Sequence, residues 1–253
     1  MKIISAFFRR SEALSAVACR LTKLTGKSKY PIHPKHLLKK DIWYMNKLKK
    51  NDIILDLGCG VGQDSLIAAR KVKKVIGTDI DPKIINIARS FAVDRGIKNV
   101  EFLVADANKK LQFKDQTFTK IVCSDVLEHL NRRDFALKEM VRILKPKGSL
   151  FLVTDNPNTS WKKELKKYGI FYYADRDHKY EYPLEEISSK LEKNKLSITL
   201  IQTVSFDTPY KGFIDLVGGI SLRYYKKLQL WKARMVKKYP NESTGYLIIA
   251  QKV

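Results

Sequence analysis

The sequence predicts an α/β protein built on a mostly parallel sheet with helices on both faces. From residue 51 onward, short apolar runs rich in β-branched residues alternate with helical stretches, an order typical of parallel strands joined by helices. A glycine-rich turn follows the first apolar run, and acidic residues follow the next two. Because parallel strands end at one edge of a sheet, these observations predict a ligand site there.

The expected elements are taken in chain order. Residues 3–24 place their apolar side chains on one helical side, and residues 34–49 form a second helix. Strands are expected at 53–57, 74–79, 100–104, 119–124, 149–155, 196–206 and 246–251. Helices are expected at 63–71, 82–95, 132–144 and 184–193, with a basic aromatic helix within 207–243. Asp81 before Pro82 is typical of a helix start, and Gly96 of a helix end.

The length of 253 residues is compatible with one large domain. We expect a helical cap over residues 1–50 and the main domain over residues 51–253. Within the main domain, residues 156–182 and 207–243 depart from the strand and helix alternation, and we expect them to be insertions on the substrate side.

The charge balance is strongly positive. The chain holds 49 Lys and Arg against 26 Asp and Glu, a net charge of +23. Such a field attracts RNA, an anionic membrane surface or a phosphorylated substrate. Lysine is scattered through nearly every segment, so the sequence leaves open whether the charge serves a partner, and it does not fix the oligomeric state.

Cysteine usage and hydropathy bear on location. Cys19, Cys59 and Cys123 form neither a C-x-x-C pair nor an even disulfide framework, which favours a reducing compartment. No apolar run approaches the ~20 residues of a membrane-spanning helix, so attachment to a membrane surface is the one membrane option left. We expect a cytoplasmic protein, with a peripheral membrane location as the alternative.

The glycine turn has the pattern of a nucleotide-type pocket. The strand 53–57 runs into Gly58-Cys59-Gly60-Val61-Gly62, which lacks side chains where a ligand must approach the backbone. A dinucleotide fingerprint needs its third glycine at position 63, where Gln63 stands, and the Lys-Ser/Thr pair of a P-loop is missing. The run resembles instead the first motif of the class I S-adenosylmethionine-dependent methyltransferases, in which Asp56 fills the place of the acid that faces the methionine part of the cofactor.

Two later segments, each following or ending a predicted strand, extend this resemblance. Asp79 matches the family's ribose-binding acid and Ile80 its apolar adenine platform, while Asp106 and Ala107 match the pair that contacts the adenine amino edge. The resemblance covers about residues 36–155 and the last two strands. It implies a Rossmann-like sheet of seven strands with an antiparallel last strand, and S-adenosyl-L-methionine as cofactor. The implied cofactor-binding residues are Asp56, Gly58, Cys59, Gly60, Gly62, Asp79, Ile80, Asp106, Ala107 and Ser124.

The fourth strand ends in Ser124-Asp125-Val126-Leu127-Glu128-His129, where acceptor chemistry is expected. This run is similar to the V-L-E-H stretch of quinone-biosynthesis O-methyltransferases. Methyl transfer is a direct displacement that depends mainly on orientation, and a base is needed only if the acceptor must lose a proton. His129 is the candidate base, with Glu128 and Asp125 beside it; a histidine that packs against the cofactor or caps a helix is the alternative.

The same run, together with His178 in Asp177-His178-Lys179-Tyr180-Glu181-Tyr182, resembles the metal-binding motifs of small-RNA 3′-terminal 2′-O-methyltransferases. That resemblance implies a divalent metal ion held by Asp125, Glu128, His129 and His178. A metal would polarise neighbouring hydroxyls. Asp125 stands where that family has Glu, and no RNA-binding module is evident.

Three functions remain in competition. The first is transfer of a methyl group to an oxygen of a small or lipid-like metabolite. The second is methylation of an RNA ribose 2′-hydroxyl with a divalent metal, and the third is a cofactor-binding regulatory protein without catalysis. DNA is not expected as a substrate. Asp155-Asn156-Pro157-Asn158 lacks the second proline found in nucleic-acid methyltransferases that act on amino groups. Cys123 lacks the Pro-Cys context of a nucleophilic cysteine in cytosine C5 methylation.

Overall fold

The structure is a computed structural model that describes residues 2–29, 31–38 and 42–253; of residues 2–12 and His36 it describes the backbone. The apolar side predicted for residues 3–12, and the part of the predicted second helix over 39–41, lie outside what is described. Close contacts divide the chain into two compact units. The helical unit comprises residues 1–40, 157–173 and 203–244, and the sheet unit comprises residues 41–156, 174–202 and 245–253.

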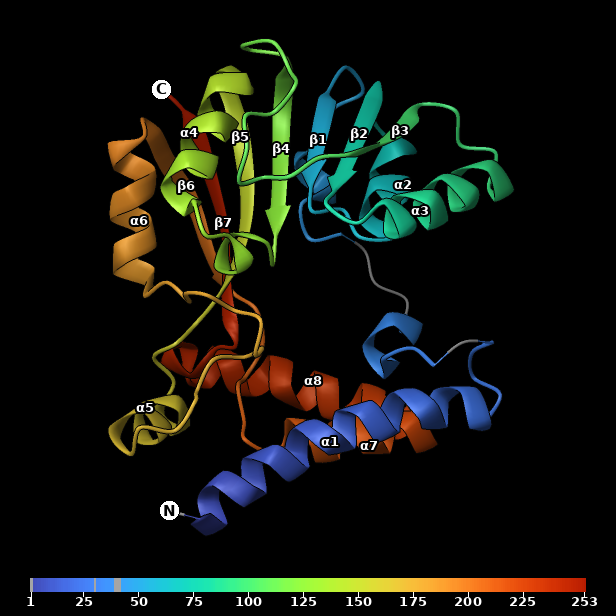
Figure 1. The fold of residues 1–253 in the computed structure, drawn as a ribbon, viewed down its shortest axis with the longest axis vertical. Coiled ribbons are helices and arrows are strands. Elements are labelled where there is room, and N and C mark those ends of the chain that lie inside the picture. The colour runs from blue at the N-terminus through green and yellow to red at the C-terminus, as the bar shows by residue number, and fades with distance from the viewer. Residues whose placement is uncertain (1, 30, 39–41) are drawn as a thin grey trace. The chain divides into compact units, whose positions relative to one another are not determined.

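The sheet unit is built on seven strands in the order β3-β2-β1-β4-β5-β7-β6 (Figure 1). Strands β1 to β5 pair in parallel, and β7 pairs antiparallel with β5, which confirms the mostly parallel sheet with an antiparallel last strand. The strands are β1 (Ile53–Leu57), β2 (Lys74–Asp79), β3 (Val100–Val104), β4 (Phe118–Ser124), β5 (Leu144–Asp155), β6 (Leu196–Thr203) and β7 (Gly245–Lys252).

Helices cover both faces of this sheet, because successive residues of a strand point to opposite sides. Leu55 and Leu57 of β1 belong to the apolar cluster that includes α4 and α6, while Ile54 belongs to the cluster that includes α2. A third cluster joins α2 and α3 to Phe102 of β3. The helices are α2 (Gln63–Ala69), α3 (Pro82–Asp94), α4 (Arg133–Ile143) and α6 (Leu184–Lys193), with the 3₁₀ turn η3 (Leu127–His129).

The predicted helix over 34–49 is wrong in the described residues. Two short 3₁₀ turns stand there, η1 (Pro34–Leu37) and η2 (Met45–Lys47), and Leu38 is extended. Tyr44 stacks on Phe151 of β5 with ring centroids 4.9 Å apart, and Trp43 meets the same ring edge-on. Burial of these aromatic rings on the sheet favours the irregular backbone over a continuous helix.

The helical unit consists of α1 (Lys2–Leu24), η1, α5 (Ser160–Lys167), α7 (Lys211–Ile220), α8 (Leu222–Lys238) and η4 (Pro240–Glu242). Helix α5 lies within residues 156–182, for which the sequence predicted no helix. Helix α1 packs along α7, and Gly219 permits this close approach, since a Cβ there would lie 2.8 Å from the Cβ of Leu21. A Cβ at Gly218 would lie 2.6 Å from Pro34. No helix in the described parts of the chain is long and apolar enough to cross a bilayer.

One buried carboxylate links the helices of this unit. Asp215 of α7 is 2% exposed and accepts hydrogen bonds from Ser15 Oγ at 2.8 Å and Tyr225 Oη at 3.3 Å, while His33 Nε2 lies 3.0 Å away. Although burial opposes ionisation, the hydrogen bonds from His33 and Ser15 hold the pKa of Asp215 below its ordinary value. The charged carboxylate therefore joins α1, the segment before η1, α7 and α8.

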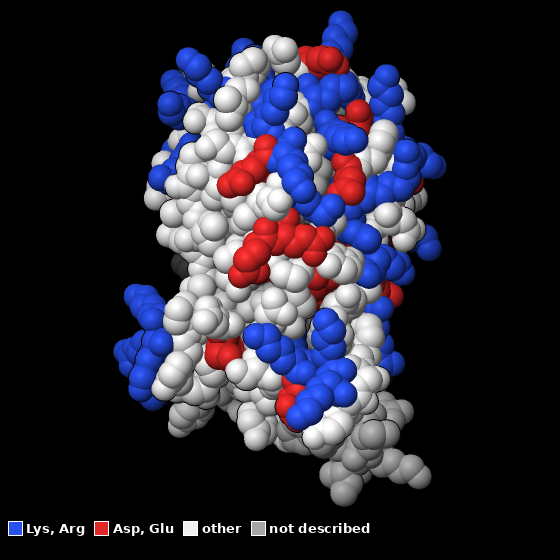
Figure 2. All heavy atoms as spheres, turned by 90° about the vertical axis from the view of Figure 1, so that its left-hand side faces the viewer, with Lys and Arg blue, Asp and Glu red and all other residues white. Residues whose placement is uncertain are grey.

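The positive charge is distributed unequally between the units. The helical unit holds 22 of the 49 Lys and Arg but 5 of the 26 Asp and Glu, so it carries 17 of the 23 excess positive charges. On the face drawn in Figure 2, Lys and Arg side chains are spread widely, and Asp and Glu form smaller groups between them.

Candidate functional site

The glycine turn after β1 has a left-handed backbone. Gly58, Gly60 and Gly62 have φ of 73°, 53° and 76°. A Cβ at Gly58 would lie 2.2 Å from Val126 Cγ2, and one at Gly62 would lie 2.4 Å from the Phe102 ring. Gly60 has no protein atom within 4 Å of that position among the described residues. The outer two glycines therefore serve packing, and the middle one leaves open space over the backbone.

Asp56 lies under this turn and is buried. Its Oδ2 accepts a 2.5 Å hydrogen bond from Ser65 Oγ at the start of α2. Burial raises the pKa of Asp56 to about 7; the Ser65 hydrogen bond counteracts this, while Asp64 and Asp79 add to it. Asp56 therefore changes charge near neutral pH.

Asp79 at the tip of β2 is held by the backbone on both carboxylate oxygens. Gly60 N donates to Oδ2 and Asp81 N donates to Oδ1, each at 3.0 Å. The Asp81 side chain caps α3 by accepting from Lys83 N, as predicted for this helix start. Ile80 is 63% exposed beside this carboxylate, so an acid and an apolar surface stand next to the glycine turn.

Asp106 and Ala107 follow β3. Asp106 Oδ1 accepts hydrogen bonds from Asn108 N at 2.9 Å and Asn108 Nδ2 at 3.1 Å. The backbone hydrogen bond from Asn108, with a smaller contribution from Lys109, lowers the pKa of Asp106. Asp56, Asp79 and Asp106 thus stand at or just beyond the carboxyl ends of β1, β2 and β3, which are neighbours in the sheet.

The segment after β4 connects the glycine turn to a second group of residues. Ser124 ends β4, and Asp125 has φ 54° with an exposed side chain. Val126 packs against Gly58, since its Cγ2 would lie 2.2 Å from a Cβ placed on that glycine. Glu128, two residues later, is 0% exposed, and neither of its carboxylate oxygens has a hydrogen-bond partner among the described residues. Burial raises the pKa of Glu128 to about 9.

The loop that carries His178 folds onto Glu128. Lys179 N and Tyr180 N donate to Glu128 O at 2.7 and 3.2 Å. His178 Nδ1 lies 2.8 Å from Glu181 Oε1 and 3.7 Å from Asp155 Oδ2. Burial disfavours the charged imidazole, but the Glu181 hydrogen bond and the Asp155 charge outweigh it and raise the pKa of His178.

Three of these side chains form a candidate metal centre. One ligand atom from each of Glu128, Asp155 and His178 lies within 4.8 Å of the other two. Two carboxylates and an imidazole are donors that divalent cations accept, and a cation would satisfy the unpartnered Glu128 carboxylate. A hydrogen bond from His178 Nδ1 to Glu181 would leave Nε2 as the ligating nitrogen. The residues present therefore fit a divalent ion.

The structure brings together part of the residues expected for a metal. Glu128 and His178 belong to the group, whereas Asp125 and His129 are not members of any such group found in the described residues. His129 is exposed, and its ring meets that of His178 edge-on with centroids 4.6 Å apart. Asp155 was missed, although its place at the end of a strand next to β4 was a usable signal.

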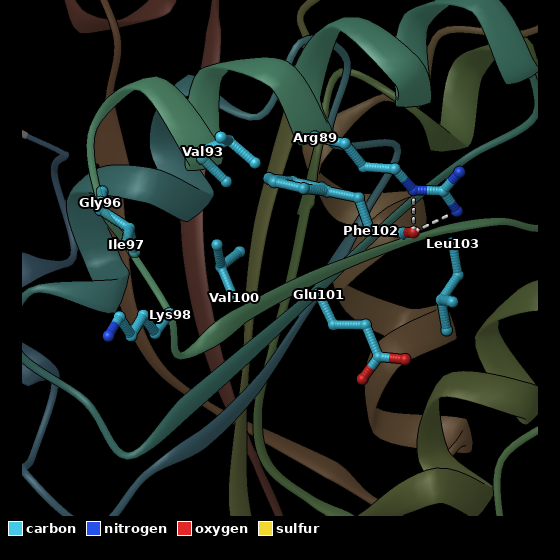
Figure 3. A pocket seen from close by; sticks show the side chains of 10 residues that line it. Arg89, Val93, Gly96, Ile97, Lys98, Val100, Glu101, Phe102 and Leu103 are labelled. Atoms are coloured by element: carbon cyan, nitrogen blue, oxygen red, sulfur yellow. Dashed lines mark hydrogen bonds between the residues drawn. The ribbon is translucent and has the colours of Figure 1, made fainter.

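A separate hollow of about 560 Å³ lies between α3 and the edge strand β3 (Figure 3). Val93, Val100 and Leu103 line it, and Arg89 donates from Nε and Nη2 to Phe102 O at 3.0 and 2.7 Å, as Figure 3 shows. None of the predicted site residues lines this hollow.

Comparisons with known proteins agree with this architecture. A family model described as "Methyltransferase domain" matches residues 48–231. A crystal structure of an S-adenosylmethionine-dependent methyltransferase from Methanosarcina mazei superposes with a TM-score of 0.61 at 23% identity, over 85% of this chain and 99% of that chain. At this identity the structural likeness shows the fold.

Two curated relatives are similar in sequence. The uncharacterized methyltransferase YcgJ of Bacillus subtilis is 29% identical over 167 residues, which are 65% of each chain. Phosphoethanolamine N-methyltransferase 3 of Arabidopsis thaliana is 27% identical over 229 residues, which are 82% of this chain and 44% of the relative. The chain thus spans less than two thirds of the length of either relative.

Proposed function

Because the chain belongs to the class I S-adenosylmethionine-dependent methyltransferases, as the family match over residues 48–231 shows, we propose that it methylates an oxygen of a small or lipid-like metabolite. The observation that supports this proposal is a group of acidic and imidazole side chains connected to the glycine turn through Val126. The group consists of Glu128, His178, Glu181 and Asp155. A hydroxyl acceptor must lose a proton on methylation, and acid and imidazole groups near the methyl donor serve that need.

S-adenosylmethionine supplies a methyl group on a sulfonium leaving group. In the proposal, Asp79 accepts hydrogen bonds from the ribose, Ile80 supports the adenine, and Asp106 with Ala107 contacts its amino edge. The open backbone at Gly60 admits the cofactor, with Asp56, Gly58, Cys59, Gly62 and Ser124 around it. Asp79 already accepts from Gly60 N, so the acid and the turn are positioned together before the cofactor arrives.

On the acceptor side, we assign His129 as the base. The acceptor oxygen attacks the methyl carbon, the carbon–sulfur bond breaks, and the hydroxyl proton passes to His129. Its exposed ring is accessible to a substrate, while contact with the buried His178 ring restrains it. In the proposal, Asp125 and Glu128 flank this base and orient the acceptor.

The name of one relative bears on the acceptor class. One is named for phosphoethanolamine, a small molecule, and for transfer to nitrogen. This favours a small acceptor, whereas the choice of oxygen rests on the buried group around Glu128.

An RNA ribose hydroxyl is the second candidate, favoured by the fit of Glu128, Asp155 and His178 to a divalent ion. Those three residues would hold the ion, which would polarise the acceptor hydroxyl and lower its pKa. Asp125 and His129, which the sequence added to this set, would stand outside it.

Labelled S-adenosylmethionine offered separately to small-metabolite, lipid and RNA fractions tests the proposal. We expect label in a metabolite or lipid product whose methyl group is bound to oxygen, and His129→Ala should lower kcat about 100-fold with an unchanged melting temperature. Label confined to RNA and abolished by a chelator would establish the second candidate. Label on nitrogen or carbon would refute the assignment of oxygen.

A further inference from the structure

The helical unit presents exposed apolar side chains at one corner. Thr25 Oγ1 at the end of α1 donates to Gly219 O at the end of α7 at 3.1 Å, so Leu24 and Ile220 stand at neighbouring helix ends. Leu24 is 79% exposed and Ile220 is 61% exposed. Tyr224, in the first turn of α8, is 60% exposed. Three helices thus contribute apolar surface that the unit itself does not cover.

Helix α8 continues from this corner with a positively charged outer face. Tyr225, Lys232 and Val236 form its buried side, and its 17 residues include no acid. We define its cationic face by its exposed basic residues, which are Arg223, Lys226, Lys227, Arg234, Lys237 and Lys238. None of them forms an ion pair with a carboxylate in the described part of the chain. Leu230, 52% exposed, lies among them at helical spacing from Lys227 and Arg234.

This combination fits one kind of partner better than others. Cations attract any polyanion, and aromatic rings suit both RNA bases and membrane interfaces. Exposed aliphatic groups such as Leu24, Ile220 and Leu230 gain free energy by entering hydrocarbon, whereas RNA binding gains little from them. The 17 excess positive charges of this unit match the negative potential of a membrane that contains anionic lipid.

We propose that the helical unit docks on the surface of a bilayer containing anionic phospholipid. Leu24, Ile220 and Leu230 enter the interface, and the cationic face of α8 contacts phosphate. Tyr224 lies at the level of the headgroups together with Trp231, which also belongs to α8 and is 43% exposed. Docking is independent of the methyl-transfer proposal, since it involves residues of the helical unit and needs neither cofactor nor acceptor.

Cosedimentation of the full chain with vesicles tests the docking. We expect binding to vesicles of phosphatidylcholine with phosphatidylglycerol that weakens as salt is raised, and little binding to phosphatidylcholine alone. The pair Leu24→Ser and Ile220→Ser should reduce the partition coefficient at least about tenfold. Val93→Ser is the control, because Val93 of α3 is also 79% exposed but belongs to the sheet unit.

Two matched double variants test how much the positive charge contributes to vesicle binding. Lys226→Gln with Arg234→Gln should reduce binding at least about tenfold, whereas Lys145→Gln with Lys147→Gln, exposed in the sheet unit, should change it less than about threefold. Circular dichroism checks the fold of each variant, and quenching of tryptophan emission by brominated lipid gives a second measure in the unaltered chain.

Equal binding to neutral vesicles, binding to RNA but not to vesicles, or parental binding by the Leu24 and Ile220 variant would overturn the proposal.

Discussion

Asp79 illustrates how much of a ligand site one residue can prepare. Its two carboxylate oxygens are fixed by the backbone amides of Gly60 and Asp81, and each oxygen retains a lone pair for a further donor. A ribose with two neighbouring hydroxyls matches this arrangement.

We therefore expect Asp79→Ala to weaken S-adenosylmethionine binding at least about tenfold, because hydrogen bonds to a charged acceptor contribute about 1.5–3 kcal/mol each. Isothermal titration calorimetry measures the dissociation constant. Asp94→Ala, an exposed acid at the end of α3, is the control. Parental affinity in Asp79→Ala would show that the ribose is placed elsewhere.

Asp56 predicts a pH dependence of cofactor binding. Its pKa is raised to about 7, so the carboxyl is mostly neutral at pH 6 and mostly charged at pH 8. Only the charged form attracts the cationic methionine end, and we expect the affinity to rise up to about tenfold between these two pH values. Calorimetry at several pH values measures this, and Asp56→Asn should remove the difference between pH 6 and pH 8 that the carboxylate causes.

At the scale of elements, the turn between β1 and α2 combines a left-handed backbone with close packing. Gly96, which ends α3 as predicted, has φ 63° and open space around it, so Gly96→Ala reports the cost of left-handed backbone alone, about 1 kcal/mol. Gly58 has a similar φ of 73° but also contacts Val126. We expect Gly58→Ala to lower the melting temperature at least twice as much as Gly96→Ala, measured by calorimetry; equal shifts would mean that Val126 moves away without cost.

The elements that meet at β4 and β5 predict a difference between two aspartates. Asp155 belongs to the candidate metal centre, and Asp125 is exposed outside it. We expect Asp155→Asn to weaken Mn²⁺ binding at least about tenfold and Asp125→Asn to leave it within about threefold, because loss of one of three protein ligands removes a charged donor. Electron paramagnetic resonance of free Mn²⁺ distinguishes them. If neither the parent nor the variants bind Mn²⁺, the metal centre is refuted and Glu128 is a buried neutral acid.

At the scale of the whole molecule, the chain combines a sheet unit carrying the proposed methyl-transfer site with a helical unit carrying most of the excess charge. Asp215 is the polar centre of the helical unit, with partners from α1, the segment before η1, and α8. We expect Asp215→Asn to destabilise this unit by at least about 2 kcal/mol. Hydrogen exchange should accelerate in α1, α7 and α8 and remain slow in β1 to β5, whereas uniform acceleration would show that both units unfold together.

The sequence by itself determined the sheet, the glycine turn and the family. These depend on short-range patterns: alternating apolar runs specify buried strands, and glycines with strand-end acids specify a turn and a polar edge. Strands β1 to β4 were predicted within one residue of their ends, whereas β5 begins at Leu144, five residues before the predicted start. The helix predicted from local sequence is absent at residues 42–48, where Tyr44 stacks on Phe151.

Only the tertiary structure decided which residues form the candidate metal centre. Glu128, Asp155 and His178 are far apart in the chain and meet because β4 and β5 pair in parallel and the backbone of residues 179–180 binds Glu128. Local spacing had favoured Asp125 and His129, but both side chains are exposed and stand outside the candidate metal centre. The distribution of charge was equally a tertiary result. The helical unit, assembled from three separate segments, holds 22 of the 49 Lys and Arg but 5 of the 26 Asp and Glu, so a scarcity of acids concentrates the excess positive charge there.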